Sequence, residues 1–179
     1  GPDYFSATQI GANYNQMFID KGGLEKLIES GKANPKVIKT LKCKTVAEGK
    51  FRHLNFIRNL PPYIVDEPPG LLGDDTAPNP SEASLAALGS CLAVGLHANA
   101  VHRGWIVRKL ELELEGDLNI SAVWGTGDVS EKPVGFTDVR IGVDMECDGI
   151  SKEEIDKLVL SACKKHLSTQ PRVMTASVH

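Results

Sequence analysis

The sequence predicts an α+β domain in which antiparallel sheets pack around a long apolar helix. Three features predict it. Residues 83–102 contain no charged side chain, which is typical of a buried helix. Residues 109–115 and 139–147 alternate apolar and polar side chains, as half-buried antiparallel strands do. Residues 155–166 carry apolar side chains at helical spacing. Strands and helices in this order favour layers of sheet and helix.

Composition sets the broad class of the protein. The chain has 179 residues, which suits one domain of the usual size, roughly 50–250 residues. Its formal net charge of -3 gives no electrostatic case for nucleic acid. Residues 83–101 approach the length of a membrane span, about 20 residues, but they include many small and polar side chains. No basic run followed by an apolar run marks a secretory signal. We therefore expect a cytoplasmic protein that binds neither nucleic acid nor membrane.

The first 41 residues form a predicted N-terminal helical extension to a domain at 42–179. Residues 1–15 lack periodicity, and this part of the extension is expected to be partly disordered. Leu24, Leu27 and Ile28 form one apolar stripe. Asn34 and Pro35 then resemble the start of a second helical piece, carrying Val37, Ile38 and Leu41.

The main domain begins with predicted strands at residues 43–67, followed by a loop rich in Pro, Gly and Asp up to residue 80. Asn79 then suits the N-cap of the central helix, Pro80 its first position and Glu82 a capping box. Gly104 should end this helix at about Arg103. Since it is nearly uncharged, we expect it to be buried almost all round.

The second half continues the alternation of sheet and helix. Ile120, Ala122 and Trp124 are expected to extend the sheet. A final helix should start at Ser151, with Glu154 completing a capping box. Residues 175–178 have the composition of a closing strand.

The four cysteines carry the most informative chemistry. None lies in a CxxC pair, so the sequence predicts no zinc ribbon and no thioredoxin-like motif. Cys91 lies in the apolar helix and Cys163 borders the stripe of the last helix, so both are expected to face packed structure. Taken singly, each is more often a small buried hydrophobe. Cys147 fits that role, and Cys43, among lysines, fits an exposed incidental thiol.

Two sequence runs together resemble a known family. NPSE at 79–82 followed by LAALGSC at 85–91 is similar to the signature of the osmotically inducible protein C and organic hydroperoxide resistance (OsmC/Ohr) superfamily. VDEP at 65–68 and the second cysteine within SACKKH at 161–166 are similar too. The resemblance extends from about residue 42 to the end and places the chain in the OsmC-like branch. It implies an intertwined homodimer with long central helices between sheets.

The resemblance also implies a peroxidase that takes part in the oxidative stress response. Cys91 matches the peroxidatic cysteine, whose thiolate reduces an organic hydroperoxide to an alcohol and becomes a sulfenic acid. Cys163 matches the resolving cysteine, which closes a redox-active disulfide. A dithiol reductant, such as a dihydrolipoyl protein, would restore both thiols. No metal and no cofactor are implied.

Thiolate formation in an apolar site requires a positive neighbour. The family uses an arginine near the first hairpin, and Arg58 is our match, with Arg52 as the alternative. Relatives hold that arginine with a glutamate ten residues before the peroxidatic cysteine, where this chain has Ser81. Glu82 is the adjacent candidate, although its capping box explains it equally well. Asp74 or Asp75 could also supply the carboxylate.

Two other functions compete with peroxide reduction. Because Ser81 replaces the family glutamate, the same fold could serve as a non-catalytic protein that binds an apolar small molecule at the dimer interface. A thiol redox sensor would also keep both cysteines. His166, three residues after Cys163, could act as a base, although an ordinary interface histidine is the commoner case.

Overall fold

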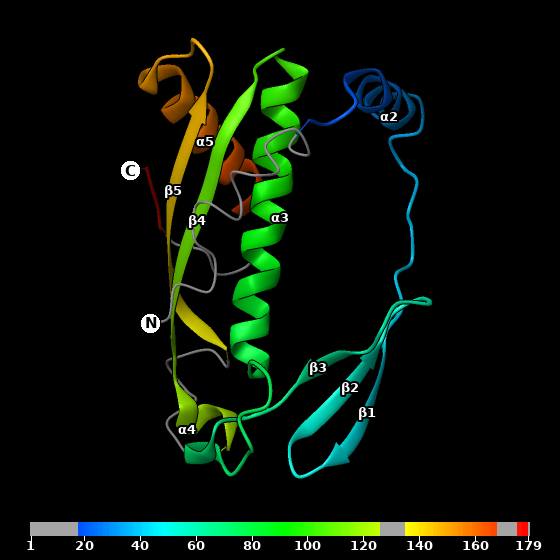
Figure 1. Ribbon diagram of the computed structural model, residues 1–179, viewed down its shortest axis with the longest axis vertical. Coiled ribbons are helices and arrows are strands. Elements are labelled where there is room, and N and C mark those ends of the chain that lie inside the picture. The colour runs from blue at the N-terminus through cyan, green and yellow to red at the C-terminus, as the bar shows by residue number, and fades with distance from the viewer. Residues whose placement is uncertain (1–17, 126–134, 168–174, 179) are drawn as a thin grey trace. The chain divides into compact units, whose positions relative to one another are not determined.

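The computed structural model describes residues 18–125, 135–167 and 175–178. Contacts between Cα atoms divide the chain into two compact units. The core unit contains residues 1–35 and 89–179, and the hairpin unit contains residues 36–88. Helix α3 (Pro80–His102) begins in the hairpin unit and continues into the core unit (Figure 1). The two units are described separately below.

The core unit is built on a sheet with the strand order β4-β5-β6. Strands β4 (Val107–Leu118) and β5 (Phe136–Cys147) form a long antiparallel pair (Figure 1). Strand β6 (Thr175–Val178) confirms the expected closing strand, but it runs parallel to β5. The α+β class with antiparallel sheets and a long central helix is therefore confirmed, with one parallel pair added at the edge.

The pairing register gives the β4–β5 sheet one apolar and one charged face. Leu112 lies opposite Val143, and Leu114 lies opposite Ile141. Opposed residues share a face of the sheet, so these side chains form one apolar layer. The other face carries ion pairs, including Lys109 with Asp144 at 2.6 Å. All helix packing on this sheet must therefore use the apolar face.

Helix α3 lies along β4 (Figure 1). Gly89 allows the close approach, since a Cβ at this position would lie 2.8 Å from Cδ1 of Leu114. The expectation that α3 is buried almost all round is wrong for the single chain. Its buried residues form one stripe, Gly89, Leu92, Leu96 and Ala100, whereas Val94 is 69% exposed. One sheet face can cover only one side of a helix.

The start of α3 agrees with the sequence prediction. Asn79 Oδ1 accepts a hydrogen bond from the Glu82 amide at 2.8 Å, and Glu82 Oε1 accepts one from the Asn79 amide at 3.0 Å. The predicted capping box is therefore confirmed. Of the helices in the described ranges, α3 alone is long and apolar enough to cross a membrane, a criterion that core helices of globular proteins also meet.

Helix α5 (Lys152–Leu167) completes the core unit. Ser151 Oγ accepts a hydrogen bond from the Glu154 amide at 3.3 Å, so the predicted helix start is confirmed. The helix contacts β5 and β6. Its buried side chains follow helical spacing and include Leu158, Val159 and Cys163. These side chains pack toward the sheet and form, with it, part of the apolar core of this unit.

The hairpin unit contains a three-stranded antiparallel sheet in the order β1-β2-β3. Its strands are β1 (Lys44–Gly49), β2 (Arg52–Phe56) and β3 (Tyr63–Val65), as expected from residues 43–67. Every residue of β1 is exposed. A short 3-10 helix, η2 (Pro69–Leu71), lies in the loop between β3 and α3.

The N-terminal extension holds one described helix instead of two helical pieces. Helix α2 (Lys21–Ala33) begins at Asp20, which caps the Gly22 amide, and it has no buried residue. Residues 37–41, expected to be helical, contain no helix. Ile38 and Leu41 are more than nine-tenths exposed, so the expected apolar stripe has nothing to pack against. Most helical stability in proteins comes from such packing.

A second difference lies after β4. Residues 120–124 were expected to extend the sheet, but Ile120–Val123 form the short helix α4. Asn119 directly precedes it, and Asn119 Oδ1 accepts a hydrogen bond from Ser121 Oγ at 2.7 Å. A short apolar run fits either a strand or a helix, and here β4 ends at Leu118 and the following run forms the helix.

Candidate active site

The two candidate cysteines lie in the core unit in opposite environments. Cys91 lies on α3 and is exposed, whereas Cys163 lies on α5 and is 1% exposed. Both are free thiols. The expectation that both face packed structure is therefore confirmed for Cys163 and wrong for Cys91. Cys91 directly precedes Leu92 of the buried stripe, and one helical residue is about 100° of rotation, which turns Cys91 away from the sheet.

Burial changes the chemistry of the second thiol. It raises the pKa of Cys163 above that of a free cysteine, because a thiolate would lose its hydration. Burial also raises the pKa of Cys147, with a smaller contribution from the charge of Asp148. Cys147 has the structural position expected for it on β5. At neutral pH both of these cysteines are therefore protonated and poor nucleophiles.

Glu82 is engaged at the N-terminus of α3. Its carboxylate accepts the Asn79 amide and thereby caps the helix. Glu82 and Cys91 are nine residues apart on this helix, which is about 180° of rotation. They therefore project from opposite sides of α3. In this structure Glu82 therefore acts as a capping residue of α3.

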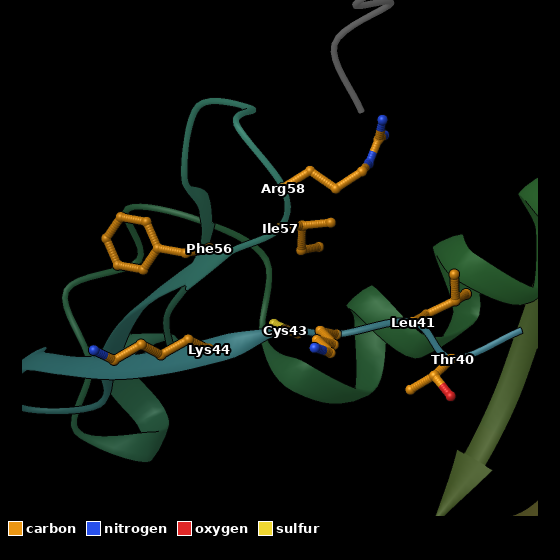
Figure 2. Close-up of a pocket in the computed structure, with 8 residues that line it drawn as sticks. Thr40, Leu41, Cys43, Lys44, Phe56, Ile57 and Arg58 are labelled. Atoms are coloured by element: carbon orange, nitrogen blue, oxygen red, sulfur yellow. The ribbon is translucent and has the colours of Figure 1, made fainter.

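Arg58 lies at the edge of an open groove in the hairpin unit. The groove has a volume of about 1000 Å³ and is lined by two segments, residues 40–44 and 56–58. Arg58 is exposed and has a left-handed backbone, with φ of 51°. Figure 2 shows its side chain extending away from Cys43 on the facing segment. In the described residues Arg58 makes no hydrogen bond or ion pair with another side chain.

Arg52 lies at the start of β2 and has fixed partners. Its Nε donates to Glu48 Oε2 at 2.6 Å, and its Nη1 donates to the Thr76 hydroxyl. Thr76 follows 24 residues later, in the loop before α3. The guanidinium therefore joins the first hairpin to that loop within the hairpin unit.

Thr76 is in turn hydrogen-bonded to Asp66, the one buried charged residue among those described. Asp66 Oδ2 accepts from the Thr76 hydroxyl at 2.6 Å and from the Thr76 amide at 3.0 Å. Its Oδ1 accepts from the Glu67 amide at 2.8 Å. These bonds, led by the Thr76 hydroxyl, lower the pKa of Asp66 to about 2. Asp66 is therefore a carboxylate at neutral pH, although it is 1% exposed.

Neighbouring acids of the same loop behave differently. Burial raises the pKa of Glu67, and the charges of Glu82 and Asp66 add to this shift. Glu67 Oε2 is buried without a hydrogen-bond partner among the described residues. Asp74, which was considered as a partner for the arginine, pairs with Lys50 at 2.6 Å. Asp75 is exposed.

Sequence reasoning missed the pair formed by Asp66 and Thr76. The available signal was an Asp directly after the buried end of a predicted strand, since Val65 is buried and Asp66 follows it. The side chain of His166 lies outside the described residues, so its proposed contact with Cys163 stays a prediction. In the described ranges no three His, Cys, Asp or Glu side chains are grouped as metal ligands would be.

Comparison with known proteins agrees with this fold. The sequence model of a family described as OsmC-like protein matches residues 73–173. An OsmC-like protein of unknown function from Vibrio cholerae has a similar structure, with a TM-score of 0.65 and 15% identity over 79% of this chain and 100% of that chain. No functionally curated protein matches the sequence.

Two similar structures are related by name to peroxide resistance. The organic hydroperoxide resistance protein OhrB of Bacillus subtilis has a TM-score of 0.52 and 18% identity, over 77% of this chain and 98% of that chain. A putative organic hydroperoxide resistance protein from Vibrio cholerae, with captopril bound in one of its active sites, has a TM-score of 0.56 and 13% identity, over 81% and 94%. At these identities the likeness shows the fold.

Proposed function

The chain belongs to the OsmC-like protein family, and from this premise we propose that it is a thiol peroxidase that reduces organic hydroperoxides with Cys91 and Cys163. The observation that carries the proposal is the contrast between these two free thiols. Cys91 is exposed, so a peroxide can reach it, and Cys163 is buried and protonated. A peroxidatic thiol must be accessible, whereas a resolving thiol must stay unreactive until the sulfenic acid forms.

The proposed reaction has two steps. The Cys91 thiolate attacks the terminal oxygen of the hydroperoxide, the O–O bond breaks, and the leaving alkoxide takes a proton to become an alcohol. Cys91 is then a sulfenic acid. The Cys163 sulfur attacks the sulfenic sulfur, a disulfide forms, and water leaves. A dithiol reductant, such as a dihydrolipoyl protein, reduces the disulfide by two exchanges.

The first step requires a thiolate at Cys91, and a positive neighbour favours it. The family resemblance gives this role to an arginine of the first hairpin, Arg58 or Arg52. Glu82, its sequence-based partner, is engaged in the capping box of α3. We retain the cysteines as catalytic residues and treat Glu82 as a helix cap.

We also propose a homodimer as the working form in a reducing compartment such as the cytoplasm. The support is apolar surface that the single chain leaves open. Val94 on α3 is 69% exposed, and Leu160 on α5 is 52% exposed. A second copy would remove such side chains from water, which is the main favourable term in association. Light scattering with size-exclusion chromatography tests this: a monomer at micromolar concentration contradicts the proposal.

The peroxidase proposal is tested with the reduced protein and one equivalent of cumene hydroperoxide. We expect loss of two thiols and a Cys91–Cys163 disulfide, identified by peptide mass. Cys163→Ser should stop at a sulfenic acid on Cys91, and Cys91→Ser should lose no thiol. Cys43→Ser is the matched control, because Cys43 is an exposed thiol outside the proposed pair. If wild-type thiols survive cumene, hydrogen and lipid hydroperoxides, the peroxidase proposal fails.

A binding protein is the second candidate, and the open groove of the hairpin unit favours it. Leu41, Phe56 and Ile57 give this groove apolar walls. Binding alone would not require either cysteine. Two results together would favour this function over catalysis. The Cys91→Ser, Cys163→Ser double variant would still bind an apolar fluorescent probe, and the wild-type protein would not react with peroxides.

A further inference from the structure

The open groove of the hairpin unit begins where the pairing of β1 with β2 ends. Lys44 and Phe56 form the last residue pair at this end of the two strands. Before Lys44, residues 40–43 belong to no strand, and after Phe56 the chain enters a turn in which the Leu60 amide donates to the Ile57 carbonyl at 3.2 Å. The two segments therefore diverge, and Figure 2 shows them facing each other across the groove. All of its lining residues belong to the hairpin unit.

A small polar network holds Cys43 at one side of this groove. Thr45 Oγ1 donates to Asn55 Oδ1 at 2.6 Å, across the β1–β2 pair. The side-chain nitrogen of Asn55 donates to the Tyr63 carbonyl at 3.0 Å. Cys43 Sγ lies 3.9 Å from Thr45 Oγ1 and 4.0 Å from Asn55 Oδ1. Cys43 is therefore an exposed thiol held against β2 in the groove, and its reactivity can report whether the groove is occupied.

The walls of the groove are apolar and open to water. Leu41 is 93% exposed, Phe56 is 40% exposed and Ile57 is 38% exposed. The groove volume of about 1000 Å³ is that of a small-molecule site, for which roughly 300–1,000 Å³ is usual. An apolar chain lying in the groove would remove all three side chains from water, which is the main favourable term in association.

The charges of the groove all have one sign. Lys42, Lys44 and Arg58 line it, and no acidic side chain lies among its lining residues. None of these three cations forms an ion pair within residues 18–125, 135–167 and 175–178. By contrast, Lys50 of the same unit is paired with Asp74 at 2.6 Å. The groove therefore combines apolar walls with uncompensated positive charge, in a chain whose net charge is -3.

We propose that this groove binds an amphiphilic carboxylate, a molecule with an apolar chain and one anionic end, as in a fatty acid. The guanidinium of Arg58 can donate two parallel hydrogen bonds to a carboxylate, and the two lysines add positive charge to the same groove. The apolar chain lies against the walls formed by Leu41, Phe56 and Ile57. A neutral lipid would leave the cations unpaired, and an inorganic anion would leave the apolar walls in water.

This inference gives a ligand class to the binding role considered above, and it does not depend on peroxide reduction. Neither Cys91 nor Cys163 lines the groove. The ligand carries no peroxide group, and no covalent bond forms or breaks when it binds.

The test uses the reduced protein and decanoate, with two further probes that have the same chain length. Decanol has no charge, and decyltrimethylammonium has the opposite charge. Titration calorimetry measures the affinity for each probe. The alkylation rate of Cys43 by iodoacetamide, a neutral reagent, reports occupancy of the groove, and Cys91, an exposed thiol outside the groove, is the internal control. Peptide mass assigns each modified cysteine.

Two double variants test the charges of the groove. Lys42→Gln with Lys44→Gln removes two cations that line it. Lys36→Gln with Lys39→Gln removes the same charge from exposed residues just before the groove, which do not line it. A difference between the two variants therefore reports position, because their net charge is equal.

A second matched pair tests the apolar wall. Leu41→Gln changes a side chain that lines the groove, and Ile38→Gln changes one that does not. Both side chains are more than nine-tenths exposed, so neither substitution removes a core contact. Circular dichroism confirms the fold of each variant.

At a decanoate concentration of about ten times Kd, we expect alkylation of Cys43 to slow by about tenfold, as occupancy of one site requires, and that of Cys91 to stay within about twofold. Decanol should bind about tenfold more weakly, and decyltrimethylammonium should give no protection, because only an anion pairs with the cations. Octanoate should bind at least about fourfold more weakly than decanoate, since it buries two fewer CH₂ groups.

The variants should separate in the same way. Loss of Lys42 and Lys44 should weaken decanoate binding by about fivefold, the effect of two exposed ion pairs. Leu41→Gln should weaken it by about fivefold as well, through lost apolar contact. The control variants at Lys36, Lys39 and Ile38 should stay within about twofold of the wild type.

Absence of decanoate binding overturns the inference, and so do equal affinities for decanoate and decanol or equal losses in the two lysine double variants. A Cys43 thiol that iodoacetamide modifies only in urea would mean that a second copy of the chain covers the groove, which overturns it too. These outcomes differ from failure of the proposed peroxidase, in which wild-type Cys91 is not oxidised by any hydroperoxide. The binding test still decides in that case, because it requires no peroxide.

Discussion

Strands β5 and β1 both pair with an antiparallel neighbour but have very different surroundings. In β5, Val139, Ile141, Val143, Met145 and Cys147 are all buried, because α3 and α5 cover that face of the core sheet. In β1 every residue is exposed, including Val46. The difference shows that a strand can form and pair without being buried, because burial depends on what covers the sheet face. The core unit is held by apolar packing, and the loop of the hairpin unit is held by polar bonds around Asp66.

The largest predicted contrast is between the mutation of a buried apolar residue in the core unit and of an exposed one in the hairpin unit. Leu158→Ala, at a 1% exposed site, should lower the free energy of unfolding by about 3 kcal/mol, through lost burial and the cavity left behind. Val46→Ala in β1 should cost under about 0.5 kcal/mol in a dilute monomer. Urea denaturation at low and high protein concentration measures both. A cost for Val46→Ala that grows with concentration would mean that a second copy covers β1.

The next prediction concerns the polar loop of the hairpin unit. A Cβ on Gly73 would lie 1.9 Å from the Glu67 carbonyl oxygen, a backbone atom with little room to move. Gly73→Ala should therefore destabilise the protein by about 2 kcal/mol. Gly70→Ala is the matched control, since a Cβ there meets nothing within 4 Å. Equal melting temperatures for the two variants would show that this loop is loosely held.

The same contrast explains which parts could be predicted from sequence. The strands at 43–67, the capping box of α3 and the start of α5 depend on residues within a few positions of one another, so local patterns suffice. The single chain buries only one side of α3, because a sequence does not say whether one chain or two provide the cover. The helix expected at residues 37–41 does not form for a related reason, since its apolar side chains have no packing partner.

In the candidate site, too, some features follow from local sequence patterns and others do not. Cys91 and Cys163 were identified through the motif around each cysteine, and the burial of Cys163 followed from its helical stripe. The Arg52–Thr76 bond joins residues 24 positions apart, and the Thr76–Asp66 bonds join residues 10 apart across an irregular loop. No periodicity extends through such a loop. Local patterns therefore point to Glu82, Asp74 and Asp75 as candidate carboxylates and give no sign of the bonds that Asp66 makes.

The two thiols should also differ in their pH dependence. Burial raises the pKa of Cys163, so at neutral pH only a small fraction is thiolate, and that fraction grows about tenfold per pH unit below the pKa. Disulfide closure should therefore accelerate by about that factor for each pH unit, which is about a hundredfold between pH 6 and 8. Disulfide closure can be followed by stopped-flow measurement after a peroxide pulse. Trapping of the sulfenic acid gives a parallel measurement of the same step. A flat profile would mean that Cys163 is not the resolving thiol.

The smallest effect concerns the start of α3, and it separates the two roles of Glu82. Glu82→Ala removes the bond to the Asn79 amide and should cost about 1 kcal/mol of stability, as lost caps usually do. Glu82→Gln keeps an oxygen that can accept this bond, so it should retain most of the stability and the wild-type oxidation rate of Cys91. A carboxylate that holds the arginine cannot be replaced in this way, because the amide lacks its charge. A Glu82→Gln protein with full stability and a tenfold slower oxidation would therefore restore Glu82 to the active site.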